Sequence, residues 1–321
     1  MAAAPGPTPP TTASQVAKDA GKVKICPGHT RPIVHINYSN IVDGTYWFVT
    51  SCHDSKPMIR NGESGDWVGT FEGHKGAVYC SAFDAGASRL VTGSGDYTAV
   101  VWDAVTGQNL HTWNHPHYIK SNDWWSDRIV TGNFDGHVRV FDANNFSPEP
   151  LITLAVAEKQ IIKNVYFVND TNIVISASES LIKKWDLRSK QVVGQLDITG
   201  LNVLDFTHYV GGTKPTLVAG HGKSISFVDP ATLQITHSFL TTDDVECASL
   251  SPDGRFVAVG SKIKAKEFAF HDGTELENHR GHHGPIFHVR YAPDGTQFAT
   301  GAEDGMCRVW PAHETILKFQ D

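Results

Sequence analysis

The stretch Gly73–Asp103, GHKGAVYCSAFDAGASRLVTGSGDYTAVVWD, decides the fold of this chain of 321 residues. It contains three short runs of apolar and β-branched residues, which are AVYCSAF, RLVTGSGD and TAVVWD, and a fourth run, TGQNLHTW, follows. Gly, Asp and Ser stand in the gaps between the runs. Short alternating runs separated by turn-forming residues are typical of β-strands joined by tight turns. The stretch therefore predicts four short strands that form one antiparallel unit.

This unit recurs along the chain. A second clear copy reads GHHGPIFHVRY, QFATGAED and MCRVW between Gly281 and Trp310, and weaker copies lie between the two and before the first. The residues equivalent to Trp102 in the seven copies are Arg60, Trp102, Phe141, Trp185, Val228, Phe270 and Trp310. Successive members of this set are 39 to 44 residues apart. That period, with four strands in each copy, is typical of the blades of a β-propeller.

We therefore predict an all-β fold, a seven-bladed β-propeller of four-stranded antiparallel blades, which spans residues 22–321. Residues 1–21 are rich in Pro, Ala and Thr, and we expect this N-terminal segment to be disordered. No apolar run reaches the length of roughly 18 residues that spans a bilayer, so no membrane contact is predicted. The five cysteines contain no C-x-x-C pair, which favours free, buried thiols in a reducing compartment.

The charge balance limits the classes of partner. Asp and Glu number 34 against 27 Lys and Arg, which gives a formal net charge of −7. A broad phosphate-binding surface needs clustered positive charge, so extensive nucleic-acid binding is not expected. A small basic strip is left open at Lys262, Lys264 and Lys266, which alternate with other residues and would share one strand face. Such a strip is either a solvated strand face or a contact for RNA or an acidic peptide.

One constellation in the second repeat resembles a nucleophilic triad. His74, Thr92, Asp96 and Trp102 bring an imidazole, a hydroxyl and a carboxylate into one repeat. The same set recurs in the seventh repeat as His282, Thr300, Asp304 and Trp310. An enzyme needs one active site rather than a periodic series, so we interpret these residues as structural. We predict no catalytic residue, no metal site, no cofactor and no small-molecule substrate.

The Gly-His, Gly-x-x-Asp and Trp-Asp signatures resemble those of WD-repeat propellers and cover about residues 22–320. The resemblance implies hydrogen bonds from indole to hydroxyl, between hydroxyl and imidazole, and between imidazole and carboxylate inside each blade. The first repeat keeps His29, Thr50 and Asp54 but has Arg60 in place of Trp. The third repeat keeps Thr131 and Asp135, with either His115 or His117 as the imidazole and with Phe141 as the ring. Repeats four to six have largely lost the polar set, and we expect apolar packing to hold them.

The resemblance also implies how the ring closes. In such propellers a strand that precedes the first Gly-His pairs into the last blade and covers its exposed edge. Here that strand would lie near Val23–Cys26. The tail Thr315–Gln320 competes for the same place, and the sequence does not decide between the two segments.

Residues Gly28–Cys80 resemble more specifically the family of serine-threonine kinase receptor-associated proteins, also called unr-interacting proteins. The pieces that carry this resemblance are HTRP, KPMIR, GDWVGTF and GHKGAV. It implies a non-catalytic scaffold, an adaptor in ribonucleoprotein assembly of the SMN type, in mRNA processing or in signalling. Its partners would be other proteins of a multi-subunit complex, with any RNA contact made indirectly. Its expected location is the cytoplasm, with the nucleus left open.

Two alternatives remain. The i subunit of eukaryotic translation initiation factor three resembles GTFEGHKGAVYC and GHHGPI, but its pattern differs at PMIRN and at Trp310. An enzyme on a propeller belongs to another class, and it would bring several titratable side chains together at the central channel. The candidate partner-binding residues are Lys56, Arg60 and one of Trp124 and Trp125. Adjacent strand residues point to opposite faces, so one of these two Trp side chains is expected in the core.

Overall fold

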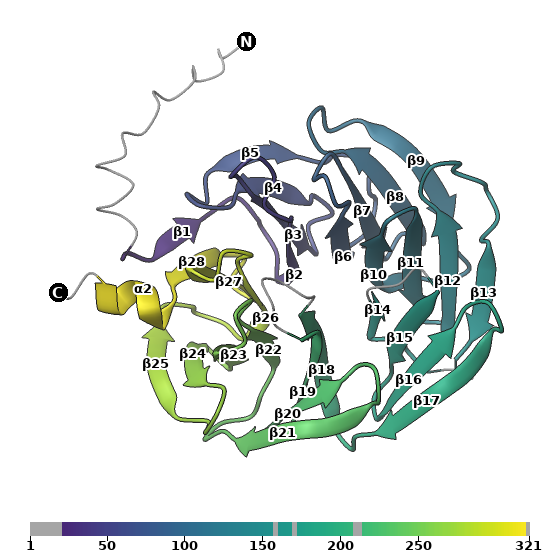
Figure 1. Ribbon diagram of the computed structural model, residues 1–321. Helices are drawn as coiled ribbons and strands as arrows, with labels where there is room; N and C mark the ends of the chain where they lie inside the picture. Colours follow the sequence, from purple (N-terminus) through teal and green to yellow (C-terminus); the bar gives the residue numbers. More distant parts are fainter. Residues whose placement is uncertain (1–20, 157–159, 169–171, 208–213, 319–321) are drawn as a thin grey trace, which may run out of the picture.

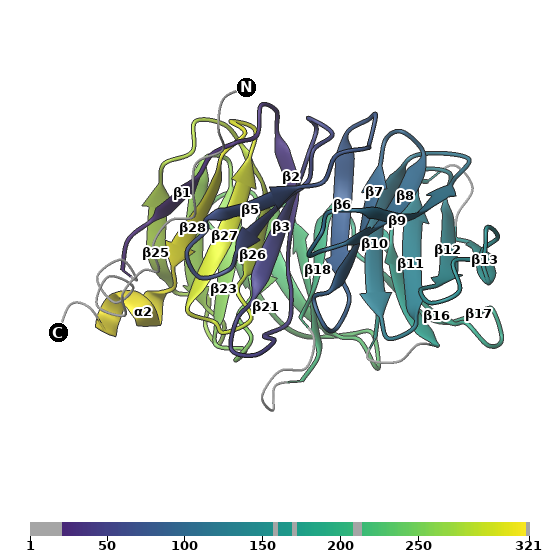
Figure 2. The same cartoon turned by 90° about the horizontal axis from the view of Figure 1, so that it is seen from above.

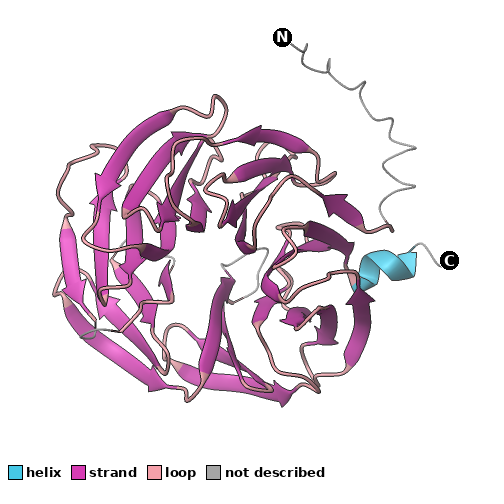
Figure 3. Cartoon of the chain, turned by 180° about the vertical axis from the view of Figure 1, so that it is seen from behind, coloured by secondary structure: helices cyan, strands magenta, loops and turns pink. Residues whose placement is uncertain are grey.

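Seven antiparallel sheets of four strands each stand around a central axis and form a ring (Figures 1 and 3). This computed structural model describes residues 21–156, 160–168, 172–207 and 214–318. The predicted all-β, seven-bladed propeller is confirmed. The segment 1–21, predicted to be disordered, lies outside the described residues except for Gly21.

Each blade is built from strands that follow one another in the sequence, except the last. Blades one and two comprise β2 (Ile33–Tyr38), β3 (Trp47–Cys52), β4 (Met58–Asn61) and β5 (Trp67–Thr70), then β6 (Val78–Phe83), β7 (Arg89–Ser94), β8 (Thr98–Asp103) and β9 (Asn109–Asn114). Blades three and four comprise β10 (Ile119–Trp125), β11 (Arg128–Asn133), β12 (His137–Asp142) and β13 (Ile152–Ala155), then β14 (Asn164–Phe167), β15 (Ile173–Ala177), β16 (Leu181–Asp186) and β17 (Gln191–Asp197). Blade five comprises β18 (Leu201–Thr207), β19 (Thr216–His221), β20 (Ser224–Asp229) and β21 (Gln234–Leu240). Blade six comprises β22 (Cys247–Leu250), β23 (Phe256–Ser261), β24 (Lys264–Ala269) and β25 (Glu275–Arg280), and blade seven comprises β26 (Ile286–Tyr291), β27 (Gln297–Ala302), β28 (Cys307–Pro311) and β1 (Lys24–Cys26).

The first strand of every blade lies innermost, and each contacts the first strands of both neighbouring blades, which closes the ring. The strands run roughly along the central axis, so the turns that join them lie on two opposite faces of the ring (Figure 2). We call the face at which the innermost strand of each blade begins the N face. The N face carries the loops that precede the innermost strands and the turns between the second and third strands of each blade. The C face is the one where innermost strands end. Residues 115–118 thus lie on the N face and residues 126–127 on the C face.

The apolar core lies between neighbouring blades. One cluster joins Val91 and Val101 of blade two to Ile119, Ile129 and Phe141 of blade three, all of them fully or almost fully buried. Each sheet packs against a neighbouring blade on both of its faces, so its central strands are buried on both sides. Burial on both sides explains why the second strands read as continuous β-branched and small residues, as in RLVTGS of β7.

The N-terminal strand closes the ring. Strand β1 pairs with β28 in antiparallel register, with Lys24 opposite Val309 and Cys26 opposite Cys307. The described part of the competing C-terminal segment, residues 315–318, instead belongs to the helix α2 (His313–Lys318), which closely follows β28, and residues 319–320 lie outside the described residues. All five cysteines are free and buried, as the spacing of the cysteines predicts.

Candidate functional site

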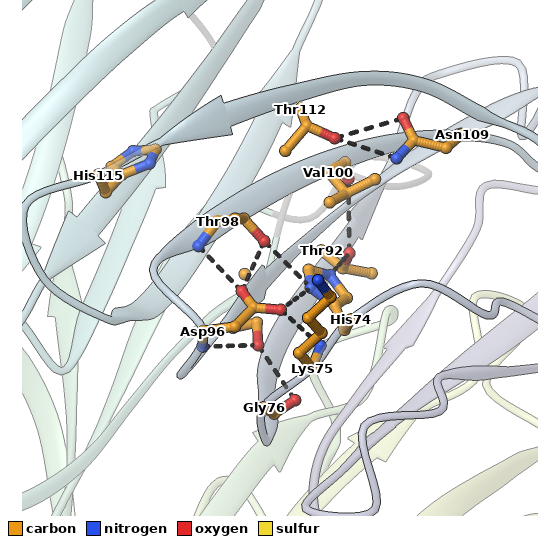
Figure 4. Close-up of polar contacts among 12 residues, drawn as sticks. His74, Lys75, Gly76, Thr92, Asp96, Thr98, Val100, Asn109, Thr112 and His115 are labelled. Atoms are coloured by element: carbon orange, nitrogen blue, oxygen red, sulfur yellow. Dashed lines mark hydrogen bonds and ion pairs between the residues drawn. The ribbon is translucent and has the colours of Figure 1, made fainter.

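The triad-like residues of the second blade form one chain of hydrogen bonds beneath the N face, and Figure 4 shows its members His74, Thr92 and Asp96. His74 Nδ1 lies 2.9 Å from Asp96 Oδ2, and His74 Nε2 lies 2.7 Å from the hydroxyl of Thr92. Trp102 Nε1 donates to the same hydroxyl at 2.8 Å. Every polar atom in this chain therefore has a partner, which offsets the cost of burying it. The chain joins the loop before β6 to the turn between β7 and β8.

The carboxylate of Asp96 is held in its charged form. Burial acts to raise its pKa, but hydrogen bonds from His74, Thr98 and the backbone of Lys75 outweigh burial and lower the pKa below the usual range. A carboxylate with this many donors is a fixed acceptor rather than a proton carrier. The arrangement therefore holds the loop before β6 and the turn between β7 and β8 together.

Blade seven repeats the whole arrangement. His282 lies 3.1 Å from Asp304 and 2.8 Å from the hydroxyl of Thr300, to which Trp310 donates at 2.8 Å. Blade one repeats only the histidine, threonine and aspartate of the set, without the tryptophan.

In blade one, His29 lies 2.8 Å from Asp54 and 2.7 Å from the hydroxyl of Thr50, and no indole is present at the position of Arg60. The Arg60 side chain turns elsewhere: its guanidinium donates to the carbonyl oxygens of Gly65, at 3.1 Å, and of Pro27. Arg60 is buried, with 2% of its surface exposed. The proposal of Arg60 as a partner-binding residue is therefore wrong, because the guanidinium ties blade one to the segment that follows the closing strand.

Blade three has a different polar set. His115, not His117, supplies the imidazole, with Nε2 3.2 Å from the hydroxyl of Thr131. Asp135 does not join this set, because its carboxylate forms an ion pair with Arg139, with 2.7 Å between Nη2 and Oδ2. The inclusion of Asp135 in a His-Thr-Asp set is therefore corrected to an Asp-Arg ion pair.

Blades four to six retain only parts of the pattern. In blade four, Trp185 Nε1 donates to the hydroxyl of Ser176 at 2.9 Å.

The predicted basic strip lies in blade six. There Lys266 is 4% exposed and is bound by Asp243 at 3.0 Å and by Glu275 at 2.9 Å. Lys266 therefore does not form a basic strip with Lys262 and Lys264, since its charge is neutralised within the blade.

The remaining candidate partner residues lie on opposite faces. Lys56 is exposed on the N face, between β3 and β4, where it forms an ion pair of 2.9 Å with the exposed Glu72. Trp124 is buried at 5% exposure in the core between blades two and three, and Trp125 is partly buried at the C face. Strand alternation thus separates the two Trp side chains in the way that the sequence predicts.

One group among the described residues brings three possible metal ligands together, His29, Cys52 and Asp54, with their ligand atoms within 4.8 Å of one another. Both ring nitrogens of His29 already have partners, in Asp54 and Thr50. Burial raises the pKa of the Cys52 thiol to about 12, which keeps it protonated. The hydrogen bonds of blade one explain why these three side chains lie close together.

An aromatic cluster on the N face was missed by sequence reasoning. It consists of His53, Tyr79, Tyr97, His117, Tyr118 and Phe134, which lie on loops and strand ends of blades one to three. Tyr97 stacks on Tyr118 with 6.0 Å between ring centroids, and His117 stacks on Phe134 at 4.7 Å. The ammonium group of Lys120 lies 4.6 Å from the centre of the Tyr79 ring. Connected rings at loop tips form a surface typical of protein interfaces.

Tyr97 carries the sequence signal that could have revealed this cluster. Its φ is 70°, in the left-handed region that side chains disfavour. The equivalent turns in blades three and seven have Gly136 and Gly305, with φ of 77° and 73°. A tyrosine where two repeats have glycine accepts backbone strain, and such strain gathers at functional positions.

The alternative of a propeller enzyme requires titratable side chains that converge at the channel, and the C-face end of the channel does contain such side chains. His35, Asp123, Tyr166 and Arg290 line one cavity there, and Asp205 pairs with Arg290. His35 Nδ1 lies 3.4 Å from the hydroxyl of Ser81, but among the described residues no carboxylate bonds to His35. Burial lowers the pKa of His35 to about 3, so the ring is a weak base. The arrangement lacks the oriented acid-base pair of a hydrolytic site.

Within the described residues, no helix is both long enough and apolar enough to cross a bilayer.

The closed ring of seven blades and the repeated His-Thr-Asp sets with Trp donors together define a WD-repeat propeller. Consistent with this class, the family model "WD domain, G-beta repeat" matches residues 65–103, 230–262 and 273–311. The chain is 36% identical over 294 residues to the serine-threonine kinase receptor-associated protein of Mus musculus, which covers 89% of this chain and 81% of that protein. The corresponding protein of Dictyostelium discoideum is 36% identical over 290 residues, or 89% of this chain and 97% of that protein. The chain belongs to the family of serine-threonine kinase receptor-associated proteins.

Similarity to the competing family is lower. Subunit I of eukaryotic translation initiation factor 3 from Anopheles gambiae is 30% identical over 311 residues, which covers 88% of this chain and 94% of that protein. The sequence-based order of the two families, with the receptor-associated proteins first, is thus confirmed.

Proposed function

We propose that this protein is a non-catalytic scaffold that joins other proteins of a multi-subunit complex, and that the N-face aromatic cluster is its main partner-binding surface. The complex is one of ribonucleoprotein assembly of the SMN type, of mRNA processing or of signalling, in the cytoplasm or the nucleus. The name of its relatives, serine-threonine kinase receptor-associated protein, supports association with such receptors as the signalling role. RNA contact is made through the partners, since the chain carries a net negative charge.

The exposed ring of Tyr97 is the observation that carries this proposal. It is 46% exposed and sits at the edge of five further rings. The imidazoles and carboxylates beneath it bond to one another and hold the loops in place. Rigid aromatic side chains on loops fixed by a scaffold supply contact area at a small cost in conformational entropy. Lys56, on the same face, extends the candidate surface towards blade one.

Affinity purification with a tagged protein from the native organism tests the proposal. The variant Tyr97→Gly removes the ring and places in the turn the residue that blades three and seven use. The matched control is Val105→Ala, because Val105 is 85% exposed in the same blade but lies in the turn between β8 and β9 on the C face. We expect Tyr97→Gly to lose at least one stable partner that Val105→Ala retains.

The identity of the captured proteins distinguishes the candidate complexes. Sm-core assembly factors support ribonucleoprotein assembly, and receptor kinases support signalling. Capture of initiation-factor subunits instead favours the role suggested by the lower similarity to subunit I. Equal recovery of all partners by Tyr97→Gly and the wild type contradicts the assignment of the N-face cluster.

A further inference from the structure

The C-face end of the central channel contains a cavity of about 520 Å³. It lies where the innermost strands of blades one to three end, and Tyr166 of blade four and Arg290 of blade seven complete its lining. A volume of this size is within the range of ligand sites in proteins. The N-face cluster lies at the opposite end of the same innermost strands, because Tyr118 precedes β10 and Trp125 ends it. The cavity is thus separate from the surface proposed above.

The charges around this cavity leave one carboxylate without a salt bridge. Arg290 is occupied, since its guanidinium donates to Asp205 and, at 3.2 Å, to the carbonyl oxygen of Phe206. Asp84 pairs with Arg89. Among the ion pairs of the described residues, none includes Asp123. Within the described part of the chain, its two oxygens accept only backbone N–H groups, from Trp124 at 2.9 Å and from Phe167 at 2.8 Å.

Asp123 is consequently an acceptor with spare capacity in a poorly solvated place. Each carboxylate oxygen can accept a further hydrogen bond. Burial raises the pKa of Asp123 to about 6, which shows that the nearby guanidinium of Arg290 does not compensate its charge in full. A second cation in the cavity would stabilise the charged form.

The amide of Asn122, beside Asp123, is closed to a ligand. Asn122 lines the cavity and is 6% exposed. Its Nδ2 donates to the carbonyl oxygen of Val91, but its Oδ1 has no hydrogen-bond partner among the described residues. Buried acceptors without a donor are rare in folded proteins. This oxygen has almost no accessible surface, so it is Asp123 that supplies the acceptor capacity that a ligand rich in N–H donors would satisfy.

The walls of the cavity are aromatic. Tyr38, Phe83, Trp124, Trp125 and Tyr166 all line it. One of these rings already holds a cation, since the guanidinium carbon of Arg89 lies 5.0 Å from the centre of the Trp124 ring. Aromatic faces attract guanidinium and ammonium groups, most strongly where water is excluded.

We propose that this cavity receives the cationic side chain of an arginine or lysine from a basic segment of a partner protein, with Asp123 as its counter-ion and the aromatic walls around its alkyl stem. The complementary charge identifies the occupant: the site offers a carboxylate and ring faces, and its own arginine is already paired. Arg290, the one lysine or arginine among the described residues that line the cavity, is paired with Asp205 and is therefore not free for an anionic ligand.

Calorimetric titration of the full chain with defined peptides tests this site. The probes are three capped hexapeptides that alternate glycine with arginine, lysine or citrulline, and citrulline keeps the shape of arginine without its charge. We expect the arginine or the lysine peptide to bind at least tenfold more tightly than the citrulline peptide. This comparison uses the wild-type protein and therefore does not depend on the folding of a variant.

The variant Asp123→Asn then localises the binding. It keeps the shape of the side chain and removes the charge, and we expect at least a tenfold loss of affinity for the cationic peptide. Asp127→Asn is the matched control, because Asp127 is exposed four residues further along and undergoes the same change of charge. Its affinity should stay within twofold of the wild type. The preferred peptide decides between arginine and lysine.

Three results overturn the proposal. These are equal binding of the cationic and citrulline peptides, cationic binding that Asp123→Asn leaves unchanged, and binding of spermidine that depends on Asp123 while no peptide binds. The last result assigns the site to a polyamine. Peptide binding by Tyr97→Gly should equal that of the wild type, so this proposal and that of the N-face cluster fail independently.

Discussion

Asp96 anchors His74 in the second blade, with 2.9 Å between Oδ2 of the carboxylate and Nδ1 of the ring. The other ring nitrogen is thereby directed at Thr92, whose hydroxyl also accepts the indole N–H of Trp102. Asp304 and His282 stand in the same relation in blade seven. The series of bonds is the same as in a catalytic triad, but here the hydroxyl of Thr92 is fully buried and also accepts the indole N–H, so the set ends inside the blade.

Removal of either carboxylate should lower stability. In Asp96→Ala and Asp304→Ala a buried imidazole loses its partner, at an expected cost of roughly 1–3 kcal/mol in the free energy of unfolding. Chemical denaturation measures this change. Asp127→Ala, at an exposed position, should stay within about 0.5 kcal/mol of the wild type. If neither blade variant differs from that control, the polar sets do not fasten the blades.

The first blade should weaken in acid. Burial acts to raise the pKa of Asp54, but the hydrogen bond from His29 and its charge prevail and lower the pKa to about 2. A carboxylate with a lowered folded-state pKa stabilises the fold above pH of about 4, and this contribution is lost as the pH falls towards 2. The stability difference between the wild type and Asp54→Asn should therefore shrink over this range. A difference that stays constant from pH 6 to pH 2 would contradict the assignment.

Arg60 should prove to be a structural residue. Arg60→Ala leaves two carbonyl oxygens, of Pro27 and Gly65, without their charged donor, and we expect a loss on the order of 2–3 kcal/mol. Lys56→Ala removes only an exposed ion pair with Glu72 and should change stability by less than about 1 kcal/mol. Thermal unfolding of the two variants side by side makes the comparison. Equal melting temperatures would mean that Arg60 does not tie blade one to the closing segment.

Tyr97→Gly should not destabilise the protein, since glycine adopts a φ of 70° without strain. We expect its stability to lie within about 1 kcal/mol of the wild type, because relief of strain offsets the lost ring contacts. Tyr97→Ala loses the same ring but keeps a side chain in the left-handed region, and it should be less stable than the glycine variant by about 1 kcal/mol. Denaturant midpoints give both values. A glycine variant less stable than the alanine variant would argue against a strained turn.

Glu267 should make the sixth and seventh blades less stable as the pH rises from acid to neutral. The residue is fully buried, and burial raises its pKa to about 7 despite hydrogen bonds from the hydroxyl of Tyr291 and the backbone of His313. The folded state then holds more protons than the unfolded state between pH of about 4.5 and 7, so stability falls as the pH rises through this range. Relative to Glu267→Gln, the wild type should lose on the order of 1–3 kcal/mol between pH 5 and pH 8. A difference that does not vary with pH would show that Glu267 keeps its ordinary pKa.

Much of the fold could be predicted because its unit is local. A period of about 42 residues, turn residues at matching offsets and the recurring Trp102 position specify the blades, and seven copies specify a ring. The members of the polar sets in blades one, two and seven could be named for the same reason, since each set lies within one repeat. Prediction failed where a side chain has a partner that the repeat pattern does not specify: Asp135 pairs with Arg139 of its own blade, and Arg60 donates to Pro27 beyond its own sheet.

The sequence by itself determined the number of blades, the strand pattern and the His-Thr pairs, because contacts within a repeat follow from spacing along the chain. Only the tertiary structure decided which end of the chain closes the ring. From the sequence, Lys24–Cys26 and Thr315–Gln320 both suit the open edge of the last blade, and the pairing of β1 with β28 shows that the first of them occupies it. Only the ring, likewise, brings six aromatic side chains of three blades together on the N face, and Asp123 beside Tyr166 and Arg290 on the C face. Those neighbours are far apart in sequence, and closure of the ring alone makes them adjacent.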